Sequence, residues 1–211
     1  FLSPLKAVTK EKFNDWSNPN HGWSGRKLSI VTGDYRLTKK RQRELKEADV
    51  IPMTSECLDS ITRSTYNEKH VWLLETGVLV VDEAHLITME GRGDRLESAL
   101  IRFTSQNPDC RVVLLSATMP NVGQLAGWLK ALNGKRTVVI ESDWRPCTLE
   151  THIKEYPSEA GWGAYYRNEK EKLEAARDIV VEYPKDKFLC FTHSKTNCRN
   201  LHEMLRDEGI K

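Results

Sequence analysis

The hydrophobic positions of this chain fall into short, branched apolar runs separated by stretches of mixed polarity. Two of the runs are residues 77–81, Gly-Val-Leu-Val-Val, and residues 112–115, Val-Val-Leu-Leu. Each run stops abruptly at small or acidic polar residues, and such runs are typical of strands buried on both faces of a parallel sheet. Further short strands are predicted at residues 1–3, 28–31, 50–53, 137–140 and 187–191.

Helical patterns alternate with these strands. They are predicted near residues 5–16, 39–47, 54–63, 94–103, 121–132, 169–183 and 197–208. The alternation of strand, turn and helix predicts an α/β fold with a parallel sheet and right-handed crossovers. A polar segment containing a proline, residues 141–148, interrupts the pattern before it restarts, which is typical of a domain boundary. We therefore predict a first domain over 1–143 and a linker with a second domain over 144–211.

Composition narrows the class of protein. The 211 residues are 39% hydrophobic, enough for a sizeable core, and 32 basic against 30 acidic residues give a net charge of +2, which argues neither for nor against nucleic acid. The five cysteines include no Cys-x-x-Cys pair, so we expect neither a disulfide framework nor a zinc site. We therefore expect the protein to lie in an intracellular, reducing compartment. No apolar run approaches ~18 residues, so no membrane span is expected.

An acidic pair, Asp82-Glu83, follows the run at 77–81. In open parallel sheets the ligand lies beyond the carboxyl ends of the strands. Asp82 is suited to hold Mg²⁺ directly or through water, and Glu83 to orient or deprotonate the water that attacks a γ-phosphate. The alternative is that these carboxylates only cap the next helix.

A series of short motifs runs along almost the whole chain. They are Phe-Leu-Ser-Pro-Leu-Lys-Ala-Val at 1–8, Thr-Gly-Asp-Tyr at 32–35, Met-Thr-Ser-Glu at 53–56 with Leu-Asp-Ser at 58–60, Asp-Glu-Ala-His at 82–85, Arg-Gly at 92–93 with Leu-Glu at 96–97, Ser-Ala-Thr at 116–118, Trp-Arg-Pro at 144–146 and Phe-Thr-His-Ser at 191–194. In this order they resemble the motor core of superfamily-two helicases, in the Ski-like branch that includes the archaeal Hel-type repair helicases.

The resemblance implies a RecA-like domain, with helices on both faces of its sheet, followed by the start of a second one. It implies an ATP-dependent helicase or translocase of the DNA-repair type that uses ATP and Mg²⁺ and acts on single-stranded or forked nucleic acid, with DNA favoured over RNA. The residues it assigns are Glu83, Asp82 and His85 for catalysis, Ser116, Ala117 and Thr118 for coupling, and Pro4, Leu5, Lys6, Thr32, Gly33, Thr54, Ser55, Thr192, His193 and Ser194 for nucleic acid.

Two family features are absent from the sequence. The phosphate loop Gly-x-x-x-x-Gly-Lys-Ser/Thr is expected upstream of Phe1, and the arginine-finger motifs are expected beyond Lys211. We therefore expect a piece of a longer protein that does not bind ATP usefully by itself. Two alternatives remain open: an RNA helicase of the same branch, or a non-catalytic helicase-like cassette that serves as a binding platform. For each Ser and Thr the alternative role is a helix cap or a backbone hydrogen bond, and for His85 it is a core group.

Overall fold

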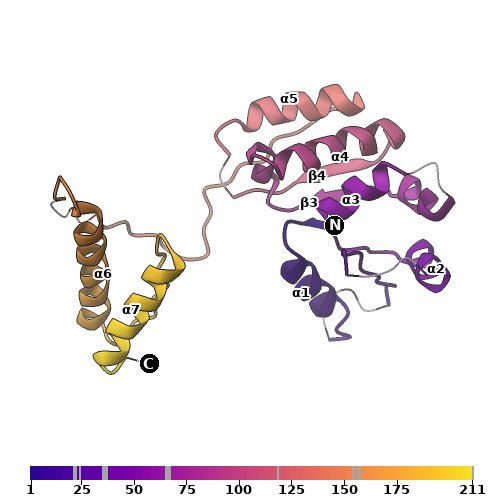
Figure 1. Ribbon diagram of the computed structural model, residues 1–211. Helices are drawn as coiled ribbons and strands as arrows, with labels where there is room; N and C mark the ends of the chain where they lie inside the picture. The colour runs from indigo at the N-terminus through magenta and orange to yellow at the C-terminus, as the bar shows by residue number, and fades with distance from the viewer. Residues whose placement is uncertain are drawn as a thin grey trace. The chain divides into compact units, whose positions relative to one another are not determined.

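The chain divides into two compact units, Phe1–Ser142 and Asp143–Lys211 (Figure 1). The computed structural model describes residues 1–20, 23, 25–34, 38–64, 68–117, 119–153, 155 and 158–210. The first unit contains the sheet and the candidate site. The predicted assignment of the units to two motor domains stays a prediction.

The sheet of the first unit is parallel, as the sequence predicts. Its order is β2-β1-β3-β4, built from β1 (Leu2–Ser3), β2 (Met53–Thr54), β3 (Val78–Val81) and β4 (Arg111–Leu114). Isolated parallel bridges join Leu28 to Val50 and Val31 to Met53, which places the segment at 28–31 beside β2. Each neighbouring pair runs parallel, so all the strands end at the same edge of the sheet.

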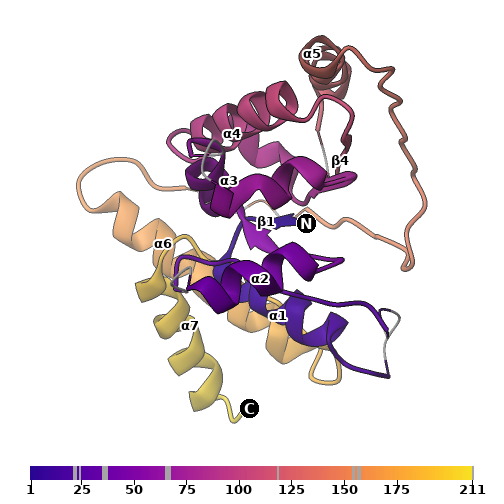
Figure 2. The same ribbon diagram turned by 90° about the vertical axis from the view of Figure 1, so that its right-hand side faces the viewer.

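Helices cover both faces of this sheet. They are α1 (Lys6–Trp16), α2 (Lys39–Glu47), α3 (Ser55–Thr62), α4 (Gly93–Gln106) and α5 (Val122–Asn133), with two 3₁₀ helices, η1 (Glu68–Glu75) and η2 (Ala84–Thr88). Figure 2 shows α3 and α4 on one side of the sheet and α1 and α2 on the other. The α/β class with helices on both faces is confirmed.

The hydrophobic core lies between the sheet and the pair α3 and α4. On α4, Leu96, Leu100 and Phe103 recur at helical spacing and are buried, with Phe103 fully enclosed. They meet Leu2 and Val81 from the central strands. Full burial of a side chain of this size contributes about 1.5–3 kcal/mol. The core therefore fixes the strands whose ends carry the polar motifs.

Two predicted strands, residues 137–140 and 187–191, are wrong. Neither joins the sheet in the described part of the chain, and Ile140 and Phe191 are both 90% exposed. An apolar run can form a strand only where a neighbouring strand satisfies its backbone groups. No strand of the described residues lies beside either segment. The prediction failed because it rested on the apolar composition of the two segments alone.

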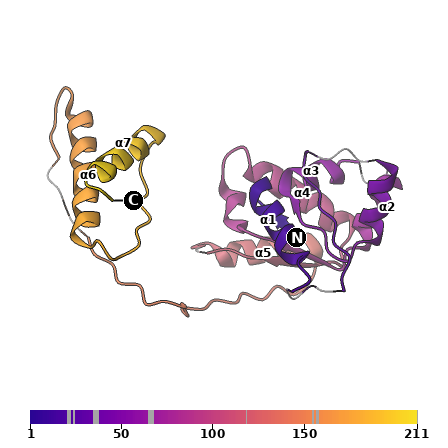
Figure 3. The ribbon, with the colours of Figure 1, turned by 90° about the horizontal axis from the view of Figure 1, so that it is seen from below.

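The second unit is built on two helices that lie side by side, α6 (Ala164–Glu182) and α7 (Lys195–Asp207) (Figure 3). Leu173 and Val180 of α6 and Leu201 of α7 are buried. Ser194 caps α7, because its hydroxyl accepts a hydrogen bond from the Asn197 backbone N–H at 3.1 Å. None of the helices described in either unit is both long and apolar enough to span a membrane.

Candidate active site

A row of polar residues lines the carboxyl edge of the sheet. The strand register aligns Val31, Met53, Leu2 and Val81 across neighbouring strands. The next residue along each strand is therefore also aligned, and these residues are Thr32, Thr54, Ser3 and Asp82. The structure thus brings together, at one edge, motifs that lie far apart in the sequence.

The hydroxyls in this row have different partners. Thr54 caps α3, accepting from the Cys57 backbone N–H at 3.4 Å, so its alternative role as a helix cap is borne out by the geometry. The hydroxyls of Ser3 and Thr32 are buried and have no hydrogen-bond partner within the described residues. A buried unpaired hydroxyl costs about 1–3 kcal/mol, so the edge keeps polar groups that its own fold does not satisfy.

The acidic pair sits in a turn that ends β3. The Asp82 carboxylate accepts a hydrogen bond from the Glu83 backbone N–H at 3.0 Å, and the Asp82 N–H donates to the Leu2 carbonyl at 3.0 Å. Glu83 adopts the left-handed conformation, φ 52° and ψ 47°. Among the described residues it is the only non-glycine with positive φ. Such backbone strain concentrates at functional sites, which favours a chemical role for the pair over simple helix capping.

His85 contacts two other predicted site residues. The His85 Nδ1 lies 3.3 Å from Glu83 Oε2 and 3.3 Å from Ser116 Oγ. The backbone positions them: Leu115 N–H donates to Val81 O at 2.8 Å, and Ala84 N–H donates to Leu115 O at 2.8 Å. A carboxylate only accepts hydrogen bonds, and which atom donates between His85 Nδ1 and Ser116 Oγ depends on the tautomer of the imidazole. The imidazole therefore links the end of β3 to the segment after β4.

The rest of the coupling motif is described in part. Ala117 is exposed and has no polar side chain, so any part it plays is through its backbone. Thr118 lies outside the described residues, and its predicted role stays a prediction.

The predicted nucleic-acid residues of the first unit also form contacts. Lys6 Nζ donates to Asp34 Oδ1 at 2.7 Å, and Lys10 Nζ lies 3.4 Å from Asp34 Oδ2. The hydrogen bond and the charge of Asp34 raise the pKa of Lys6, while the two lysines lower the pKa of Asp34. Gly33 lies beside this group, since a Cβ there would be 3.7 Å from Lys6 Nζ. Two cations against one anion leave the start of α1 locally positive.

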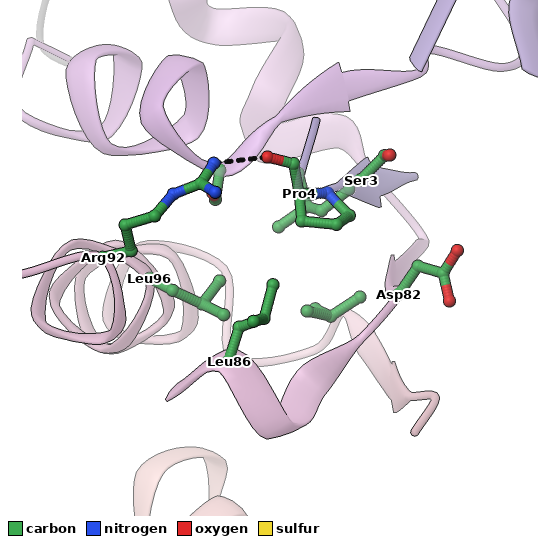
Figure 4. Close-up of a pocket in the computed structure, with 9 residues that line it drawn as sticks. Ser3, Pro4, Asp82, Leu86, Arg92 and Leu96 are labelled. Carbon is green, nitrogen blue, oxygen red and sulfur yellow. Dashed lines mark hydrogen bonds between the residues drawn. The ribbon is translucent and has the colours of Figure 1, made fainter. Parts of the chain in front are cut away.

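One residue with no predicted role joins three of the motifs. Nη2 of Arg92 donates to the carbonyl of Pro4 (Figure 4) and to Glu56 Oε1, the latter at 3.0 Å. In Figure 4, Leu86 and Leu96 point into the small hollow beneath Arg92, and the Asp82 carboxylate points away from them. The Arg-Gly pair at 92–93 is visible in the sequence, but nothing in it indicates a partner 88 positions away.

Three predicted nucleic-acid residues lie in the second unit. Thr192 Oγ1 donates to the Ser194 carbonyl at 3.2 Å, and Ser194 caps α7. His193 lines a hollow with Glu169, which accepts hydrogen bonds from Lys172 at 2.8 Å and Asn197 at 2.6 Å. The Lys172 hydrogen bond is the main reason that the pKa of Glu169 is lowered. Ser194 thus has the helix-cap role, and a role in binding stays a prediction for all three.

The donor set at the end of β3 fits a nucleotide-bound magnesium ion. Mg²⁺ of this kind keeps several waters and takes one or two carboxylates together with phosphate oxygens. Asp82 is half-buried, and the one hydrogen bond that its carboxylate accepts comes from the neighbouring amide. Across the described residues there is no cluster of three or more His, Cys, Asp or Glu side chains, so a site built from protein ligands alone is not expected there.

Comparison with known proteins shows which family the chain belongs to. The sequence model of the DEAD/DEAH box helicase family matches residues 1–125. The chain therefore belongs to the DEAD/DEAH box helicase family, and the resemblance of its motifs to superfamily-two helicases is confirmed.

Individual relatives point to the archaeal branch. The chain is 35% identical over 156 residues to the ATP-dependent DNA helicase Hel308 of Methanocella arvoryzae, covering 72% of this chain and 19% of that protein. It is 32% identical over 207 residues to Hel308 of Methanocaldococcus jannaschii, covering 95% and 16%. With Hel308 of Pyrococcus horikoshii it shares 36% over 155 residues, covering 72% and 19%. The chain spans less than a fifth of the length of these relatives.

Proposed function

We propose that this protein is an ATP-dependent helicase or translocase that acts on single-stranded or forked DNA inside the cell. The observation that carries the proposal is the contact of His85 with both Glu83 and Ser116, beside Asp82 at the end of β3. An acid pair at the end of one strand provides the groups needed for ATP hydrolysis. The imidazole that joins this pair to the next strand provides a contact through which hydrolysis can affect that strand. The names of the relatives support DNA over RNA as the substrate.

Each site residue has a distinct part in the proposed reaction. Bound Mg²⁺ would neutralise charge on the phosphates of ATP, and Asp82 would hold it directly or through a water. The Glu83 carboxylate orients the attacking water and accepts its proton. His85 Nδ1 lies beside both the Glu83 carboxylate and the Ser116 hydroxyl, at 3.3 Å from each. A movement of the Glu83 side chain during turnover would therefore be transmitted through His85 to Ser116, in the segment after β4.

The proposed grip on the strand uses the ends of β1 and β2. The helices α1 and α3 begin after these neighbouring strands, so their N-terminal turns lie at the same edge of the sheet. Backbone N–H groups at helix starts bind phosphates whatever the base, and Lys6 adds positive charge. A protein that steps along a strand needs such a sequence-independent grip.

Glutamine at position 83 tests the catalytic assignment in the complete protein. Glu83→Gln removes the base and keeps the size of the side chain. We expect ATP turnover to fall by about 10²–10⁴-fold, the usual contribution of a general base, with ATP binding retained. Glu90→Gln is the matched control, because Glu90 is exposed on the same segment and should leave turnover unchanged. Hydrolysis by Glu83→Gln at the parental rate would show that the assignment is wrong.

Stimulation of the ATPase tests the substrate. Single-stranded DNA should stimulate turnover more than RNA of the same length, and stronger stimulation by RNA would favour the RNA helicase of the same branch. A parental protein that binds DNA without hydrolysing ATP would instead be the non-catalytic cassette, acting as a binding platform.

A further inference from the structure

Arg92 is placed where two predicted nucleic-acid elements meet. Its guanidinium donates to the carbonyl of Pro4, the residue between β1 and the cap of α1, and to Glu56 in the first turn of α3. The two acceptors come from different motifs, and Arg92 itself starts α4. One planar side chain with several fixed donors can hold two acceptors at a set spacing.

Gly93 explains why Arg92 can reach this position. A Cβ at residue 93 would lie 2.2 Å from the carbonyl oxygen of Ile87 and 2.9 Å from that of Leu86. Only glycine therefore lets the start of α4 pack directly against η2, and the Gly93 N–H donates to Met89 O at 2.7 Å. Because η2 follows the acidic pair, this packing fixes Arg92 relative to Asp82 as well as to Pro4.

The hollow beneath the guanidinium also places Arg92 between Asp82 and Pro4. It is lined by Asp82 and Leu86 from the nucleotide side and by Pro4 and Ser55 from the nucleic-acid side. Arg92 closes it above (Figure 4). Only the residues that line this hollow therefore separate the end of β3 from the starts of α1 and α3.

We propose that Arg92 is a positioning residue that holds the starts of α1 and α3 at the spacing needed to bind the phosphates of a nucleic-acid strand. The inference rests on the proposed function, because it assumes that these two helix starts form the grip. Arg92 acts through the Pro4 carbonyl and Glu56 and need not touch the strand itself. Loss of the guanidinium would weaken binding of the strand while leaving the chemistry of ATP hydrolysis in place.

The test compares Arg92→Gln with Arg95→Gln in the complete protein. Arg95 lies on the same helix, is exposed, and forms no hydrogen bond or ion pair with the described residues. We expect Arg92→Gln to raise the concentration of single-stranded DNA that half-saturates the ATPase by about tenfold, equivalent to about 1.4 kcal/mol of binding free energy. Turnover at saturating DNA should stay within about twofold of the parental value, since a positioning defect acts on binding rather than on kcat.

Two further variants separate positioning from general damage to the fold. Arg92→Lys keeps the positive charge but loses the planar fork of donors, and Glu56→Gln keeps an uncharged acceptor. Each should therefore give an intermediate shift in the DNA concentration that half-saturates the ATPase. The double variant Arg92→Gln/Glu56→Gln should be no worse than Arg92→Gln alone, because the residues act as one unit. If Arg92→Gln does not fold, the two milder variants carry the test.

The outcomes distinguish the two proposals. If the parental protein shows no DNA-stimulated ATPase, the proposed function fails and this inference fails with it. If the parental protein is stimulated but Arg92→Gln half-saturates at the same DNA concentration as Arg95→Gln, only the role of Arg92 is overturned. The role of Arg92 would also be overturned if Arg92→Gln lost turnover at saturating DNA without any shift in the DNA concentration that half-saturates the ATPase.

Discussion

The hydroxyl of Ser116 lies 3.3 Å from Nδ1 of His85. The contact joins residues that follow neighbouring strands, and the same nitrogen is 3.3 Å from Glu83 Oε2. One imidazole therefore touches both the proposed base and the segment after β4. Mutation of either residue can therefore test the proposed connection between hydrolysis and strand movement.

Removing the Ser116 hydroxyl is expected to uncouple the two activities. In Ser116→Ala the imidazole keeps Glu83 but loses its contact with the next strand. We expect the number of base pairs separated for each ATP hydrolysed to fall by about tenfold, as for loss of about 1.4 kcal/mol of coupling. Parallel ATPase and unwinding assays measure this ratio. Ser105→Ala, an exposed serine of α4, is the control, and an unchanged ratio in Ser116→Ala would contradict the prediction.

Alanine at position 93 should destabilise the first unit. Its Cβ would overlap the Ile87 carbonyl oxygen at 2.2 Å, and because that atom belongs to the backbone, η2 and α4 must separate. Overpacking of this kind costs about 1–3 kcal/mol. Gly127→Ala in α5 meets nothing within 4 Å and should instead stabilise by about 0.5–1 kcal/mol. Urea unfolding of both variants gives the comparison, and equal effects would rule out the steric explanation.

Asp59 joins α3 to α4 through Arg102 and also pairs with Arg63 at the end of its own helix. It accepts hydrogen bonds from Arg63 at 3.2 and 3.1 Å and from Arg102, and its side chain is only 13% exposed. Asp59→Ala leaves these cations without their acceptor. Because Arg63 is well exposed and keeps its hydration, we expect a loss of about 1–3 kcal/mol rather than the larger cost of a fully buried pair.

The control for Asp59 is Asp109→Ala. Asp109 pairs with Lys135 at 2.7 Å, but its side chain is 86% exposed, so the free energy of unfolding should not change measurably. Chemical denaturation of the two variants under the same conditions decides the matter. A similar loss in both would mean that burial is not what gives the Asp59 network its effect.

The ion pair of Glu56 with Arg92 predicts a pH dependence of stability. Burial raises the pKa of Glu56, but hydrogen bonds from its own backbone N–H, Arg92 and Thr54 together lower it below the ordinary value of 4.5. A carboxyl whose pKa is lowered by folding stabilises the fold above its unfolded pKa, and this contribution is lost as the pH falls through the lowered value. The parental protein should therefore melt above Glu56→Gln at neutral pH.

Thermal melting as a function of pH checks this sign. The difference in Tm between the parental protein and Glu56→Gln should shrink as the pH falls below 4.5 and should be constant above neutrality. A difference that grows on acidification would show that the Glu56 carboxylate does not contribute to stability in the way its contacts indicate.

The sequence predicts two neighbouring strands of the sheet to within one residue. The run predicted at 77–81 becomes β3 (Val78–Val81), and the run predicted at 112–115 becomes β4 (Arg111–Leu114), as expected for short branched apolar runs in a parallel sheet. Since the strands are parallel, the polar residues that follow them meet at one edge, so the meeting of Glu83, His85 and Ser116 also follows from the pattern.

Other features depend on contacts that a local pattern does not contain. The hydrogen bond from Arg92 to Pro4 is set by the packing of Gly93 on η2, which no periodicity records. The runs at 137–140 and 187–191 have strand composition, yet no neighbouring strand among the described residues pairs with them. Propensity states what a segment can form, and pairing decides whether it does so.

The left-handed backbone of Glu83 has a consequence for evolution and design. Glycine or asparagine tolerates φ 52° better than glutamate, and either would raise the free energy of unfolding, by about 1 kcal/mol for relief of this conformation. Both replacements would also remove the carboxylate. Selection for a more durable fold and selection for a faster motor therefore favour different residues at this position, and a stability-based redesign of the chain should leave Glu83 untouched.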